Sequence, residues 1–242
     1  MAVLEVRNVS RRFGGLQAVA EASLEAQAGR ITALIGPNGA GKTTLFAIMA
    51  GFLRPDSGSV QFDGRDITGL APHRICRLGL VRTFQIVQPF GALSVRENIA
   101  VGSHLHQRAR RQALEQAEAV ARQVGMEAQL DKPAQGLTIA GRKRLELARA
   151  LATQPRLLLL DEVMAGLTPT EVNEIVAVIK GIRDAGVTIL LIEHVMQAVM
   201  SLSDDIYVLN QGRIIAHGAP RAIASNPQVI EAYLGRKAVA HA

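Results

Sequence analysis

The sequence is poor in cysteine and in long apolar runs, and each shortage excludes a feature. The single cysteine, Cys76, cannot form a disulfide within the 242-residue chain, and we expect it to be a small packing residue. Charged residues such as Asp161 and Glu162 interrupt the longest apolar stretches, so no segment supplies the ~20 apolar residues of a membrane-spanning helix. Glu5 and Arg7 break the N-terminal segment where a signal peptide needs an apolar core, which predicts a cytoplasmic chain.

Aromatic residues are also scarce, at 3% of the sequence, although the formal net charge is +6. Basic residues form short clusters within 11–12, 108–111 and 142–144. Proteins that bind single-stranded nucleic acid stack bases on aromatic rings. The composition therefore favours solvated basic helix faces over nucleic-acid binding, and it is compatible with an anionic ligand or a membrane surface.

Four apolar runs predict buried parallel strands: ITALI (31–35), LGLVRTF (78–84), LLLL (157–160) and VTILLIE (187–193). They are short, almost continuously apolar and rich in branched residues, as strands covered on both faces are. Helical periodicity follows several of them, for example over 170–186 before Gly186 ends the helix. This alternation predicts an α/β fold with a mainly parallel core sheet.

Weaker strand patterns predict a small antiparallel β layer. Residues 2–9 and 58–64 alternate between apolar and polar side chains, as half-buried strands do. Residues 205–218 are typical of a hairpin that turns at Gln211 and Gly212, and we assign this hairpin to the same layer.

A helical subdomain interrupts the α/β pattern. Over 92–135 the apolar residues follow helical spacing, and no strand pattern returns until Pro155 has passed. We interpret the chain as one domain, with a core of residues 1–85 and 157–242 and a helical subdomain of about 86–156.

The segment GPNGAGKT (36–43) predicts a phosphate-binding loop, because it follows an apolar strand and opens a helix. Glycines let backbone N–H groups point at phosphate oxygens, and the helix N-terminus adds partial positive charge. Lys42 is expected to bridge the terminal phosphates and Thr43 to reach magnesium. A chance glycine-rich turn is the alternative. The predicted nucleotide-binding residues are Gly36, Pro37, Asn38, Gly39, Ala40, Gly41, Lys42, Thr43 and Thr44.

The segment LLLLDE predicts the acidic half of the same site. A carboxylate at the end of a buried strand needs a compensating charge, and nucleotide-bound Mg²⁺ would supply one to Asp161. Glu162 is then available to deprotonate an attacking water. The alternative is a pair of acidic residues that opens a loop.

Gln85 and His194 each follow another predicted strand. Ligands of an open parallel sheet bind outside the carboxyl ends of its strands, so both side chains are expected to converge with Lys42, Asp161 and Glu162. We assign Gln85 and His194 to catalysis with Glu162, and Gln85 to the metal with Thr43 and Asp161. A single His or Gln at the end of a strand is usually structural, and it is their common position that favours a functional role.

Together GPNGAGKT, RTFQ, LLLLDE and LLIEHVM resemble, in order and spacing, an ABC-type ATP-binding cassette. The resemblance covers essentially the whole chain. It implies that ATP and Mg²⁺ are the ligands, that Phe13 stacks on adenine, and that Val19 lies beside it.

A closer resemblance is carried by FGGLQAV, GFLRPDSG, DITGLAPHRI, GLVRTFQ, DEVMAGLTP, EHVMQAVM and VIEAYLG. These segments are similar to ATP-binding subunits of bacterial branched-chain amino-acid importers. The resemblance implies a peripheral protein at the cytoplasmic face of the plasma membrane. It also implies two permease subunits and a second ABC ATPase, like or unlike, as partners, with a solute-binding protein acting indirectly.

The segment LTIAG (137–141) occupies the place of the family signature Leu-Ser-Gly-Gly-Gln, which contacts ATP held by the other subunit. Thr138 retains the hydroxyl, whereas Ile139 and Ala140 replace the glycines. The helix N-terminus can still attract an anion, but a Cβ at these positions restricts φ. Because the helix dipole is retained, we expect a working, weakened half-site, and the alternative is a dead one. Thr168 is a second departure, where related cassettes usually carry Asp.

We therefore interpret the chain as the ATP-hydrolysing subunit of an importer, with branched-chain amino acids as the expected solute. Similar ATPases serve urea uptake and lipopolysaccharide export. A soluble ABC ATPase of chromosome maintenance, repair or translation is disfavoured, because 242 residues leave no room for a long coiled coil or a second cassette. A nucleotide-gated module without hydrolysis is permitted by the altered signature but disfavoured by Glu162.

Overall fold

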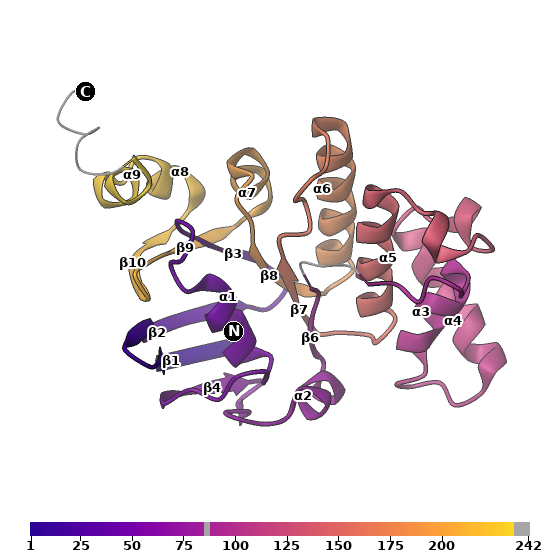
Figure 1. Ribbon diagram of the computed structural model, residues 1–242, viewed down its shortest axis with the longest axis horizontal. Helices are drawn as coiled ribbons and strands as arrows, with labels where there is room; N and C mark the ends of the chain where they lie inside the picture. The colour runs from indigo at the N-terminus through magenta and orange to yellow at the C-terminus, as the bar shows by residue number, and fades with distance from the viewer. Residues whose placement is uncertain (85–87, 235–242) are drawn as a thin grey trace.

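Two β-sheets flanked by helices make up the computed structural model, which describes residues 1–84 and 88–234 (Figure 1). The strands are β1 (Ala2–Phe13), β2 (Leu16–Gln27), β3 (Ile31–Ile35), β4 (Ser57–Phe62), β5 (Arg65–Asp66), β6 (Leu80–Arg82), β7 (Leu157–Asp161), β8 (Thr188–Ile192), β9 (Asp205–Asn210) and β10 (Arg213–Gly218). The α-helices are α1 (Lys42–Met49), α2 (Pro72–Leu78), α3 (Val95–Ser103), α4 (Arg110–Gln123), α5 (Ile139–Leu151), α6 (Pro169–Asp184), α7 (Met196–Leu202), α8 (Pro220–Ala224) and α9 (Pro227–Leu234). Two 3-10 helices are η1 (Glu127–Gln129) and η2 (Ala134–Gly136).

The core sheet has the strand order β10-β9-β3-β8-β7-β6, in which all neighbours are parallel except β10 and β9. All four predicted parallel strands lie in it, so the predicted α/β class is confirmed. The run at 78–84 yields only the three residues of β6, because α2 continues to Leu78. Gly79 then ends that helix in a left-handed conformation, with φ +102°.

Helices cover both faces of the core sheet. On one face, Leu34 and Leu159 pack with Phe46 of α1, which lies between the core sheet and the second sheet. On the other face, Leu158 packs in one apolar core with residues of α5, α6 and α7, such as Ile175. Strands buried on both faces explain why the runs are continuously apolar rather than alternating.

The second sheet is antiparallel, in the order β2-β1-β4-β5, and contains the predicted strands at 2–9 and 58–64. Its strand β2 was not predicted, because its sequence is rich in Ala and Glu and both have low strand propensity. The assignment of the 205–218 hairpin to this layer was wrong. Its first strand, β9, pairs parallel with β3 and so extends the core sheet.

The turn of that hairpin links three parts of the fold. Gln211 and Gly212 both have positive φ, +47° and +79°, as a tight two-residue hairpin requires. The N–H of Gly212 donates to the Ala40 carbonyl at 2.9 Å, and the Gly212 carbonyl accepts from the Ala20 N–H at 2.8 Å. One peptide segment thereby fastens the core sheet to the second sheet and to the 36–43 loop.

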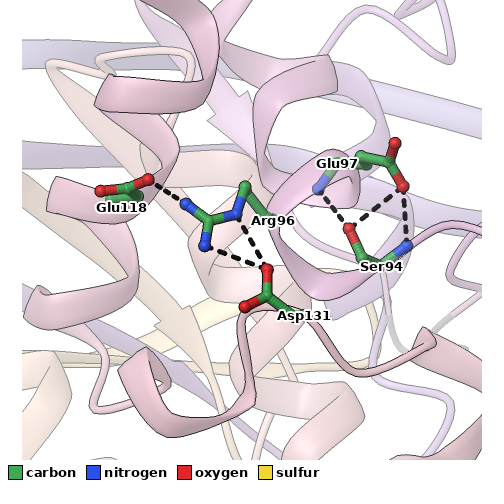
Figure 2. Close-up of polar contacts among 5 residues, drawn as sticks. All are labelled: Ser94, Arg96, Glu97, Glu118 and Asp131. Carbon is green, nitrogen blue, oxygen red and sulfur yellow. Dashed lines mark hydrogen bonds and ion pairs between the residues drawn. The ribbon is translucent and has the colours of Figure 1, made fainter.

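Helices α3, α4 and α5 gather at one end of the molecule, opposite α8 and α9 (Figure 1). A capping box between Ser94 and Glu97 starts α3. Figure 2 shows Arg96 between Glu118 of α4 and Asp131, whose Oδ1 accepts from the Arg96 guanidinium at 3.0 and 3.2 Å. These contacts join the start of α3 to α4 and to the loop before η2.

No strand of either sheet lies in the described stretch from 88 to 156, which the sequence analysis assigns to a helical subdomain. The division into core and subdomain stays a prediction. Within residues 1–84 and 88–234, no helix has both the length and the apolar character that a membrane crossing needs.

Candidate functional site

The 36–43 loop runs from the end of β3 to the start of α1, and two of its glycines are sterically required. Gly36 has φ +150°, and a Cβ there would lie 1.9 Å from the Leu209 carbonyl oxygen. Gly41 has φ +105°, and its Cβ would lie 2.2 Å from the Ala18 carbonyl oxygen. Only glycine fits both the backbone conformation and the space. The loop is therefore packed tightly against β9 and β2.

Lys42 is the first residue of α1 and folds back over the loop. Its Nζ donates to the carbonyls of Gly36 at 2.7 Å and Pro37 at 3.0 Å. Burial lowers the pKa of Lys42, while the carboxylates of Glu162 and Asp161 act to raise it. The ammonium group thus lies in the loop, within electrostatic reach of both acidic residues.

A cavity of about 440 Å³ opens beside the loop and Lys42. Phe13 lines this cavity with 45% of its surface exposed, and the Arg11 guanidinium carbon lies 5.1 Å from the Phe13 ring centroid. Val19 does not line the cavity, which corrects the sequence-based expectation: its side chain is fully buried in the core. Neighbouring residues on the strand supply the wall instead. The lining residues are Phe13, Leu16, Gln17, Ala18, Asn38, Gly39, Ala40, Gly41, Lys42, Thr43, Thr44, Glu162 and Gln211.

Strand β7 ends at Asp161, and Glu162 follows it in a different environment. Asp161 is 2% exposed, and its Oδ2 accepts from the Arg82 guanidinium at 2.6 Å. Glu162 is half-buried, lines the cavity and has φ +49°. A left-handed conformation at a non-glycine residue costs roughly 1–3 kcal/mol and is concentrated at functional sites. The turn thus separates the two carboxyl groups, and only Glu162 opens onto the cavity.

Two buried ionisable residues lie behind Glu162. Lys143, from α5, donates from Nζ to the Glu162 carbonyl at 3.0 Å, and burial lowers its pKa. Glu193 follows β8, and its Oε1 accepts from the Met164 N–H at 2.9 Å. Burial raises the pKa of Glu193 to about 7, and the negative charge of Glu162 acts in the same direction.

The structure does not bring every predicted side chain to the cavity. His194 follows Glu193, at the carboxyl end of the sheet, with an exposed side chain that is not part of the cavity wall. Gln85 lies outside the described residues. Thr138 is the N-cap of α5, where its Oγ1 accepts from the Gly141 N–H at 3.1 Å.

The altered turn forms a regular helix start. Neither Ile139 nor Ala140 has positive φ, so their Cβ atoms impose no backbone strain in this conformation. Ile139 points outward, 62% exposed, whereas Ala140 is buried. Thr168 caps α6 in a capping box with Glu171, a role that the sequence comparison with Asp did not suggest.

Sequence reasoning missed Arg82, Lys143 and Glu193. Arg82 carried one usable signal, because it is a charged residue inside the apolar run LGLVRTF. Lys143 lies in a basic cluster that suggested a solvated helix face, so its pattern did not indicate burial. Glu193 is the last residue of the predicted strand VTILLIE (187–193), and a carboxylate at the end of a buried strand was a signal that the sequence analysis used only for Asp161.

Comparison with known proteins places the chain in a family. Residues 19–165 match the model of the ABC transporter family, and residues 213–239 match the model described as branched-chain amino acid ATP-binding cassette transporter. The chain is 42% identical to the high-affinity branched-chain amino acid transport ATP-binding protein BraF of Pseudomonas aeruginosa, with 96% of this chain and 98% of BraF covered. It is 41% identical to LivG of Escherichia coli, described in the same words, with the same coverage.

Solved structures agree with this placement. A nucleotide-free ATP-binding cassette from an ABC transporter superposes with a TM-score of 0.89 at 31% identity, covering 98% of this chain and 100% of that one. A cassette in its ADP conformation gives a TM-score of 0.89 at 32% identity with the same coverage. The fold, the loop around Lys42 and these relatives together establish that the chain belongs to the ABC transporter family, as one of its nucleotide-binding ATPase cassettes.

Proposed function

We propose that this chain is the ATP-hydrolysing subunit of an importer for branched-chain amino acids. The observation that carries the catalytic part is the shared cavity, in which the phosphate loop, Lys42 and the strained Glu162 face one space. The names of BraF and LivG support the solute. The match of residues 213–239 to a branched-chain amino acid family model supports it independently.

In this proposal the backbone N–H groups of 36–44 and the start of α1 hold the phosphates, and Phe13 stacks on adenine. Lys42 leaves its carbonyl partners for the terminal phosphates. Glu162 takes the proton of the attacking water, and its cavity-facing position supports that role. His194 and Gln85 would complete the site from the ends of their strands.

Thr43, in the first turn of α1, lines the cavity, and Asp161 interacts electrostatically with Lys42 of the phosphate loop. A hydroxyl and a carboxylate are oxygen donors of the kind that Mg²⁺ prefers. The residues therefore fit the ion, with Gln85 as a third candidate donor. Bound Mg²⁺ would neutralise charge that develops on the phosphates. Arg82 forms an ion pair with Asp161 and balances its charge.

The proposed partners are two permease subunits and a second ABC ATPase, with a solute-binding protein acting through the permeases. Exposed apolar side chains support a docking surface near residues 85–95: Phe84 and Phe90 are each almost half exposed. A groove of about 370 Å³ between β6, α3 and α5 lies beside them. We place the chain at the cytoplasmic face of the membrane. We also retain the boundaries of the core and the helical subdomain that the sequence predicts.

The altered turn supports function in a pair. In a dimer of cassettes, the start of α5 would meet the partner's ATP, where Thr138 and the helix N-terminus remain. The outward Ile139 is the side chain that such a contact must accommodate. In a pair of unlike chains, only the partner's nucleotide would meet this turn.

The test is ATP turnover by the complex purified from the native host with its permeases, carrying Glu162→Gln in this chain. If Glu162 is the base, turnover at this site falls by about 100-fold or more, while ATP affinity is retained. Glu127→Gln, on exposed η1, is the control. Unchanged turnover in Glu162→Gln would refute the assigned base, and a wild-type complex that binds ATP without hydrolysing it would favour a nucleotide-gated module.

A further inference from the structure

The carboxylate proposed to bind metal already has a cationic partner. Asp161 Oδ2 and Arg82 Nη2 are 2.6 Å apart, and the two side chains are 2% and 9% exposed. A buried carboxylate requires a counter-charge, which the sequence analysis assigned to Mg²⁺. In this conformation the protein supplies that charge itself.

Arg82 is held in place by more than this ion pair. Its strand, β6, pairs with β7 so that Arg82 lies opposite Leu159. Its guanidinium carbon lies 5.9 Å from the Phe52 ring centroid and 5.7 Å from that of Phe84, and the two rings meet edge to face. Such cation–π contacts hold a desolvated guanidinium without satisfying its donors. The Arg82 Nε is indeed buried without a hydrogen-bond partner.

A second cation at Asp161 would compete with this arrangement. Lys42 already contributes positive charge from the phosphate loop, and its electrostatic interaction includes Asp161. A nucleotide-bound divalent ion would place further positive charge beside the guanidinium, in a region shielded from solvent. The charge-assisted hydrogen bond from Arg82 occupies one of the two carboxylate oxygens of Asp161, Oδ2, and so lowers the negative charge that Asp161 would offer to the ion.

We propose that Arg82 is the resident counter-ion of Asp161 and that it competes with nucleotide-bound Mg²⁺ for this carboxylate. The inference rests on the proposed magnesium-dependent nucleotide site. Arg82 also lines, with Phe84, the groove between β6, α3 and α5. Release of Arg82 from Asp161 therefore changes the charge and shape of the groove proposed to receive the permease.

The experiment measures how much Mg²⁺ tightens ADP binding, which needs no turnover. Calorimetry on the purified full-length chain gives the dissociation constant of ADP in EDTA and in Mg²⁺. The readout is the constant in EDTA divided by the constant in Mg²⁺, so a larger ratio means that Mg²⁺ tightens ADP binding more. In Arg82→Met the ion no longer displaces a hydrogen-bonded cation, so the ratio rises by about tenfold or more relative to wild type. Arg82→Lys, which keeps a charge but loses the guanidinium geometry, gives an intermediate ratio.

Arg149→Met is the matched control. Arg149 lines the same groove, and its guanidinium carbon lies 5.0 Å from the Phe90 ring centroid, but it forms an ion pair with Glu146 rather than with Asp161. Its ratio should equal that of wild type. A ratio in Arg82→Met that is unchanged or lower than wild type overturns the proposal, because Arg82 would then merely position Asp161.

Measured unfolding temperatures show whether each variant is folded. Arg82→Met leaves Asp161 buried without this partner and should unfold at a lower temperature, whereas the double variant Arg82→Met/Asp161→Asn should recover. Mg²⁺ with ADP should raise the unfolding temperature of Arg82→Met by more than that of wild type. If Mg²⁺ fails to tighten ADP binding in wild type as well, the proposed metal site itself is refuted, and the competition falls with it.

Discussion

Replacing Glu193 with Gln should alter the pH dependence of stability in a defined direction. Glu193 is 2% exposed, and its Oε2 has no hydrogen-bond partner. Burial raises its pKa from 4.5 to about 7. The folded chain therefore binds this proton more tightly than the unfolded chain does. Glutamine has nearly the same shape and mimics the protonated, neutral carboxyl group at every pH.

The sign and size follow from linkage. The stabilising effect of the bound proton is fully present below pH 4.5 and is lost as pH rises towards about 7. Above that pH, the stability no longer changes with pH through this group. Each pKa unit corresponds to about 1.36 kcal/mol. A difference of about 2.5 therefore corresponds to about 3 kcal/mol of destabilisation when the carboxyl is ionised. Glu193→Gln removes that penalty, so its stability advantage over wild type grows with pH.

Urea unfolding of both chains at about pH 5 and about pH 8 tests this reasoning. The free energy of unfolding of Glu193→Gln, relative to wild type, should be about 2–3 kcal/mol more favourable at the higher pH. Glu171→Gln is the control: its capping-box hydrogen bonds lower the pKa of Glu171, so its effect is constant over this range. A pH-independent difference for Glu193→Gln would show that the carboxyl is ionised throughout or protonated throughout.

Three further variants test the loop and two helix starts. Gly41→Ala places a Cβ 2.2 Å from the Ala18 carbonyl oxygen, so calorimetry should show ADP affinity reduced by about tenfold or more. The control is Gly181→Ala, whose Cβ meets open space and should leave ADP affinity unchanged. Thr168→Ala removes the N-cap of α6 and should cost about 1 kcal/mol in urea unfolding, and Thr168→Asp should retain that stability. Asn98→Ala leaves the Phe90 N–H without its hydrogen-bond partner. It also removes the side-chain donor from the carbonyls of Phe90, Leu93 and Ser94, each of which keeps a backbone N–H donor. The substitution should cost about 1–3 kcal/mol by the same measurement. An Asn98→Ala chain as stable as wild type would mean that water replaces the amide.

The features that sequence predicted best are those fixed by local pattern. Continuous apolar runs located the parallel strands, and glycine spacing located the loop around Lys42, because these patterns reflect burial and backbone conformation directly. Strand β2 was missed because it is rich in Ala and Glu, which have low strand propensity, and pairing with β1 overrides that preference. The hairpin at 205–218 was found, but a local pattern carries no information about which strand β9 pairs with.

The site was predictable where a residue acts through its own chain neighbours and unpredictable where it acts through space. Asp161 and Glu162 follow directly from the apolar strand before them. Arg82 is 79 residues from Asp161 in sequence, and only the pairing of β6 with β7 brings them together. Val19 was misplaced for a similar reason, because one position along a strand decides whether a side chain faces the core or the cavity.

The Gln211–Gly212 turn has a practical consequence for engineering the chain. Tight turns on the surface are normally the places where a tag, an inserted domain or new chain termini are tolerated. Here both hydrogen-bonding groups of Gly212 are already used, by Ala40 and Ala20, and a Cβ on Gly212 would lie 3.1 Å from the Ala18 oxygen. An insertion at this hairpin would therefore loosen the phosphate loop, whereas Gly64, around which a Cβ meets nothing, offers a turn that can be extended.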